Sequence, residues 1–348
     1  MTHPAGPQML EVGTRPRRVV STRRVVVSSV FVLLASTGAA TFAASPQVLI
    51  PTVDGLQDAG LLTEIMAPMT RALRLVCAVG AVGALVVAVL LGPRADGRAG
   101  LHAAAARWAA AWALATVASL VFDLSQGSGI PLADLVAEGG SEALRVLARQ
   151  VQALLLSAWL AALVSFLARR VDTHRGSLTV SGVALAALIP PALVGHSGGA
   201  DVSWLATTSL LVHVVAVTVW TGGLLALCAH VSSSRLRQQG DLVARFSTLA
   251  LGCYVAVGVS GIANAAARAT PAELWDNRAY LGLLAVKLAL FTTLGGFGWL
   301  HRRRFVRRSI DGMSPRFWSL AAVEVLLMVT ALGIAVVLTH TAPGMPGH

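Results

Sequence analysis

Residues 195–230 read GHSGGADVSWLATTSLLVHVVAVTVWTGGLLALCAH, and this stretch is the clearest indication of the fold class. A polar turn that holds His196 leads into an apolar run that carries His213. The run is long enough to cross a hydrocarbon core of ~30 Å, which takes ~20 residues as a helix. An ionisable side chain within such a helix is a functional hypothesis by default, so the two histidines are the first candidates for a site.

The rest of the chain repeats this apolar pattern. Of its 348 residues, 55% are hydrophobic and only 12% are charged. Lipid offers the backbone no hydrogen-bond partners, so spans of this composition must be helices. We therefore predict an all-α, polytopic transmembrane helical bundle of about nine spans, near residues 25–44, 67–92, 101–122, 143–168, 177–195, 203–230, 246–267, 280–300 and 317–339.

Arginines set the expected orientation of the bundle. With the N-terminus inside, the inner segments carry eighteen arginines and the outer loops carry two, Arg268 and Arg278. This excess follows the positive-inside rule and predicts a cytoplasmic N-terminus and a C-terminus outside. We expect no nucleic-acid partner despite the net charge of +11. The basic clusters lack the aromatic or glycine-rich motifs that nucleic-acid recognition uses.

The apolar and charged patterns divide the chain into four regions. The run at 25–44 is either a first span or the core of a signal peptide, and its length favours an uncleaved anchor. The sequence has no Walker motif, dinucleotide fingerprint, nucleophile elbow or HExxH motif, so we expect no enzyme. The regions are a cytoplasmic arginine-rich segment at 1–24, about four spans at 25–175, about five spans at 176–340, and a short extracytoplasmic tail at 341–348.

Polar side chains inside the later spans are further candidates. His213 shares a helical face with Trp220 and offers an imidazole to a metal or a proton; the alternative is a buried histidine bonded to a neighbouring serine or carbonyl. Asn264 orients a ligand or water, or makes an interhelical hydrogen bond. Lys287, the only lysine, and Glu324 need partners or a wet cavity, which fits either an ion path or structural pairing.

Two arginine stripes lie in the predicted outer half. One is Arg71 with Arg74 in the second span, and the other is Arg145 with Arg149 in the fourth. Arginine binds carboxylates bidentately, so an anion site, for example for haem propionates, is one interpretation. Pairing with nearby acids is the favoured interpretation, because a charge within the membrane needs a partner. The acids are Asp123, Asp134 and Glu138.

Three more residues are candidate metal donors. Met66 and Met69 lie near the outer end of the second span, and His340 lies near the C-terminus on the predicted outer side. Thioethers suit Cu(I), although a methionine pair also packs well at such a boundary.

A series of short motifs runs through residues 190–340 in a defined order. They are Gly195-His196, His213, Trp220-Thr221-Gly222-Gly223, Arg245-Phe246-Ser247, the run from Gly258 to Ala265, the run from Tyr280 to Leu290, and His301-Arg302-Arg303-Arg304. Their order and spacing resemble the copper resistance D (CopD) family of bacterial inner-membrane proteins.

The resemblance implies a multi-pass protein of the bacterial cytoplasmic membrane that handles copper, with 176–340 as its copper resistance D-like domain. It makes copper the expected ligand of His196 and His213, with Met66, Met69 or His340 completing the site. Such a protein binds copper at its outer face and transports it across the membrane or delivers it within. The implied partners are the copper ion, the lipid bilayer, and an extracytoplasmic copper chaperone or oxidase assembly partner.

Two other functions fit parts of the pattern. The first is a haem-binding membrane redox protein, with histidines as axial ligands and the outer arginines on the propionates. Against it, only His213 lies well inside a span, whereas a bis-histidine site needs two. The second is an assembly factor for a respiratory oxidase, with the histidines passing copper to a partner.

Overall fold

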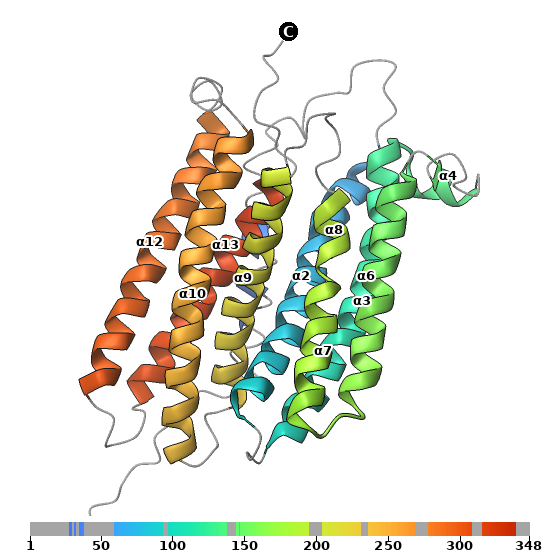
Figure 1. The fold of residues 1–348 in the computed structure, drawn as a ribbon. Coiled ribbons are helices and arrows are strands. Elements are labelled where there is room, and N and C mark those ends of the chain that lie inside the picture. The colour runs from blue at the N-terminus through green and yellow to red at the C-terminus, as the bar shows by residue number, and fades with distance from the viewer. Residues whose placement is uncertain are drawn as a thin grey trace, which may run out of the picture.

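The computed structural model describes residues 28–29, 31–32, 35–37, 59–92, 97–137, 144–145, 147–194, 204–230, 236–268, 278–307 and 315–338. Within these ranges the regular structure is helical, without a β-strand, and the long helices stand side by side in one bundle (Figure 1). The helices are α2 (Leu61–Leu90), α3 (Arg98–Ser128), α4 (Leu132–Ala137), α6 (Ala148–Ala168), α7 (His174–Ala186), α8 (Ile189–Val194), α9 (Trp204–His230), α10 (Leu236–Arg268), α12 (Arg278–Arg307) and α13 (Pro315–Leu338).

The predicted all-α membrane bundle is confirmed. Six stretches of the described chain are long and apolar enough to cross a membrane, and α12 and α13 add shorter apolar stretches. Most of the predicted span at 25–44 falls outside the described residues. Orientation stays a prediction. We call the end where α2 begins and α3 ends, at the top of Figure 1, the predicted outer end.

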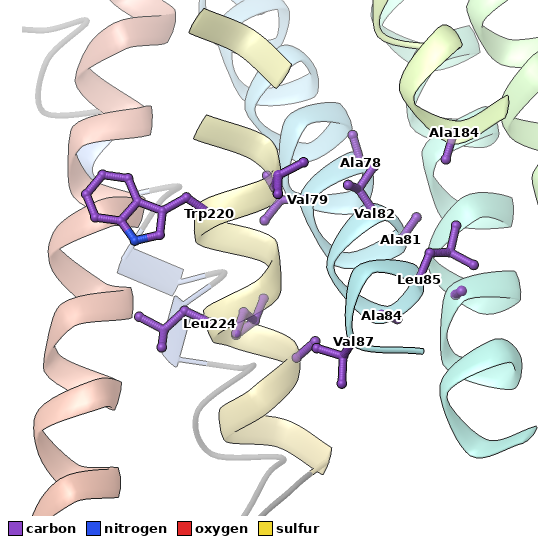
Figure 2. Packing of buried hydrophobic residues seen from close by; sticks show 14 of the residues in the cluster. Ala78, Val79, Ala81, Val82, Ala84, Leu85, Val87, Ala184, Trp220 and Leu224 are labelled. Atoms are coloured by element: carbon purple, nitrogen blue, oxygen red, sulfur yellow. The ribbon is translucent and has the colours of Figure 1, made fainter. Parts of the chain in front are cut away.

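Helix α2 is the centre of the bundle and the most buried of the six spans. It packs against α3 on one side and α9 on the other. Small residues such as Ala78, Ala81 and Ala84 are fully buried along it (Figure 2). At the crossing with α9, a Cβ on Gly83 would fall on the backbone of Gly222, and one on Gly222 would fall on that of α2. Small residues at an interface let helix backbones approach closely, and this crossing depends on them.

The predicted span at 177–195 is interrupted between α7 and α8. Pro190 and Pro191 have no N–H, so the carbonyls of Ala186 and Ala187 lose their helical donors. Ser157 on α6 donates its hydroxyl to the Ala187 carbonyl at 2.8 Å. A neighbouring side chain thus satisfies the freed backbone group, as a break inside a membrane requires.

Basic side chains hold the inner end of α2. Arg98 donates to the Gly92 carbonyl and to the Asp172 carbonyl, the latter at 3.3 Å. Arg245 on α10 donates to the Leu90 carbonyl at 3.1 Å. The last carbonyls of a helix lack intrahelical donors and favour cations. Two of the arginines at this end therefore bind backbone carbonyls at or just after the end of α2, and Arg245 joins α10 to α2.

Candidate functional site

His213 is held from α10 by a hydrogen bond. It lies nine residues into α9, ~14 Å from the outer end of that helix at 1.5 Å per residue. Its Nδ1 is 3.0 Å from Ser260 Oγ, and Ser260 is buried. A Cβ on Gly261 would sit 3.6 Å from Cε1 of His213, so α10 packs against the imidazole at this position. The predicted alternative, a histidine bonded to a neighbouring serine, is the contact that is seen.

Lys287 on α12 occupies the same depth as His213. Phe291 touches α10 at Gly258, where a Cβ would be 3.1 Å from the ring. Lys287 lies one turn outward of Phe291, and Gly261 lies about one turn outward of Gly258. Lys287 is also within electrostatic range of the His213 ring. We name His213, Ser260 and Lys287 the outer polar layer, because three helices contribute to it at one level.

Three rings follow ~6–10 Å further in, at the rise of 1.5 Å per residue. Trp220 and Tyr254 meet edge to face with centroids 5.6 Å apart, and Tyr254 stacks on Phe291 at 4.3 Å and 2° between planes. This aromatic layer again joins α9, α10 and α12. Trp220 is among the predicted site residues, whereas Tyr254 and Phe291 are not. Their only signal was an aromatic residue on each of two neighbouring spans.

The other candidate residues lie at several places. Asn264 is half-buried on α10, one turn outward of Ser260. Glu324 is buried on α13, within electrostatic range of Cys228 near the inner end of α9, and so lies deeper than the outer polar layer. Met66 and Met69 are half-buried in the first turns of α2. His196 and His340 lie outside the described residues.

The number of donors that converge on His213 is small. Across the described ranges, no group of three or more histidine, cysteine, aspartate or glutamate side chains is placed to hold a metal ion. Cys77, Cys228 and Cys253 are free and buried, as expected of small apolar residues. Any metal at His213 therefore takes further ligands from another residue type or from the rest of the chain.

The arginine stripe of α2 is paired. Arg71 Nε lies 2.6 Å from Asp123 Oδ1, and Arg71 Nη2 donates to Gln126 at 2.7 Å. Arg74 donates to Ser119 at 3.2 Å. The predicted pairing with an acid is confirmed for Arg71 and Asp123. Because this carboxylate already occupies Arg71, the stripe does not support a haem propionate site. In the second predicted stripe, Arg149 lies in the first turn of α6 and Arg145 lies just before that helix, and both side chains are exposed.

Residues 240–338 match the family described as Copper resistance protein D. The matched part comprises α10, α12 and α13, with Ser260, Lys287 and Glu324, and it is shorter than the predicted resemblance over 190–340. His196 and His213 lie outside the match, on its N-terminal side. No curated protein and no solved structure matches the chain. This match over α10, α12 and α13 supports the predicted resemblance to the copper resistance D family of membrane proteins.

Proposed function

We propose that this protein binds copper through His213 in the outer part of the membrane, and transports the ion across or delivers it within the bilayer. The observation that carries the proposal is the hydrogen bond between His213 and Ser260. It joins a histidine of α9 to a helix of the copper resistance D match. Imidazole nitrogen is a good ligand for copper, and bound histidines are commonly oriented by such a second contact.

Other residues have roles within this proposal. His196, Met66, Met69 and His340 are the proposed additional donors on the outer side. Asn264, Lys287, Trp220 and Glu324 are proposed to line or orient the ion's path. The proposed location is the bacterial cytoplasmic membrane, with the extracytoplasmic face receiving copper. A copper chaperone or an oxidase assembly partner on that face is the proposed exchange partner.

A His213→Ala variant is expected to bind copper at least roughly tenfold more weakly, since loss of even an outer partner of a metal ligand costs about 10–100-fold. The measurement is copper content and affinity of purified protein in detergent, titrated with Cu(I). His102→Ala is the matched control. That histidine bonds to Ser177 at 2.9 Å at the inner end of the bundle and should leave copper binding unchanged.

Equal copper binding by the wild type and the His213→Ala variant would contradict the proposed site.

A separate measurement, the copper content of cells that carry the His213→Ala variant, distinguishes transport from delivery. A transporter variant changes the copper that the cell accumulates, whereas a delivery variant changes copper loading of an outer partner at constant cellular copper.

A further inference from the structure

We infer that Ser260 is a positioning residue that fixes the tautomer of His213, with the proton on Nδ1 and the lone pair on Nε2. Nε2 is then the atom that accepts the cation. The tautomer follows from the contacts of Ser260 alone. Only the identity of the cation rests on the proposed function.

The Ser260 hydroxyl donates its hydrogen to a backbone carbonyl of its own helix. Its Oγ lies 2.5 Å from the carbonyl oxygen of Ala256, one turn earlier in α10. Two oxygens approach this closely only with a hydrogen between them, at the short end of O–H···O bonds. A hydroxyl has one hydrogen to donate. The longer contact from Oγ to the Val257 carbonyl oxygen, 3.3 Å, can only share that same hydrogen. Ser260 must therefore act as an acceptor toward a nitrogen that approaches it.

The side-chain contact of that oxygen is with Nδ1 of His213, at 3.0 Å. Because Ser260 accepts here, Nδ1 must donate and carries the ring proton. A neutral imidazole has one N–H, so Nε2 keeps its lone pair. The chain of bonds runs from the His213 ring through Ser260 to the Ala256 carbonyl.

The geometry of the ring then selects the class of ligand. The two ring nitrogens point in diverging directions, so a ligand at Nε2 leaves the Ser260 contact in place. Helix α10 covers the Nδ1 edge, where a Cβ on Gly261 would be 3.8 Å from Nδ1 and 3.6 Å from Cε1. A lone pair binds a Lewis-acidic cation and repels an anion. With one imidazole as donor, a soft or borderline cation such as Cu(I) or Ag(I) suits the site.

The direct test is nitrogen-15 NMR of histidine-labelled, metal-free protein in lipid nanodiscs. We expect the His213 signals of the wild type to show protonated Nδ1 and unprotonated Nε2. Ser260→Ala should lose this preference, and Ser260→Thr, which keeps the hydroxyl, should retain it. Thr248→Ala removes an exposed hydroxyl of the same helix, which donates to Ala244 at 3.3 Å, and should change nothing.

Cu(I) titration of the same variants adds a functional readout. Ser260→Ala should lower affinity by about 10–100-fold, as for other partners of metal ligands, and Ser260→Thr should restore most of it. A wild-type ring protonated on Nε2 overturns the inference, whether or not the variants fold. A wild-type ring protonated on Nδ1 with no copper bound leaves the inference standing and removes the proposed function instead.

Discussion

A Gly222→Val variant is expected to be destabilised by about 3 kcal/mol or more, at the upper end of overpacking effects. The new side chain would fall on the carbonyl oxygen of Val79 and against the backbone of Gly83. Backbone atoms cannot rotate away as a side chain does, so α2 and α9 must separate. Their separation opens the core around α2, where Val82 and Leu85 are almost fully buried.

Thermal unfolding in detergent, followed by helical circular dichroism, measures this effect. Gly252→Val is the matched control on α10, because a Cβ there has nothing within 4 Å. The control should unfold near the wild-type temperature. If Gly222→Val unfolds at the same temperature as Gly252→Val, the crossing of α2 and α9 is looser than described.

An Asp123→Ala variant should lose about 3–5 kcal/mol, the range expected when one partner of a buried ion pair is removed. Asp123 is 3% exposed and Arg71 is 11% exposed. Arg74 lies within electrostatic range of both side chains. Without Asp123, two guanidinium groups face each other within the bundle. Without Arg71, Asp123 keeps Arg74 nearby, so Arg71→Leu should cost less than Asp123→Ala.

A double-mutant cycle isolates the pair. Arg71→Leu combined with Asp123→Leu should recover part of the loss, because apolar residues of similar volume often replace a buried pair at little cost. Thermal unfolding of the wild type, Arg71→Leu, Asp123→Leu and the double variant in one detergent gives the coupling energy between the two side chains. Additive effects would mean that the 2.6 Å contact contributes no coupling, and would contradict its role in joining α2 to α3.

Much of the fold follows from the sequence because lipid allows few choices. Apolar runs had to be helices, and a charge such as Arg71 had to find an acid. The break between α7 and α8 was missed, since the apolar run hides it. Its signal was Pro190-Pro191, and the compensating donor, Ser157, lies on another helix. Local pattern thus predicts elements better than their interruptions.

The site was predicted as residue types rather than as contacts. His213 was predicted as a site residue and Ser260 lay within the Gly258–Ala265 motif, but their bond depends on the register of α9 against α10. That register is set by close approaches such as Gly223 against Phe246, which a single sequence does not display. The stack of Tyr254 on Phe291 was missed for the same reason, since its rings come from different helices.

The aromatic layer supplies an optical test of mechanism. An ion that moves inward from His213 along α9, α10 and α12 must pass the level at which Tyr254 stacks on Phe291. Trp220 rests edge-on against the same tyrosine, so its emission responds when the stack parts. We expect transport along this route to separate the rings in each cycle, and delivery at the outer face to leave them stacked. A protein that keeps Trp220 as its only tryptophan would therefore report, during copper loading, which of the two takes place.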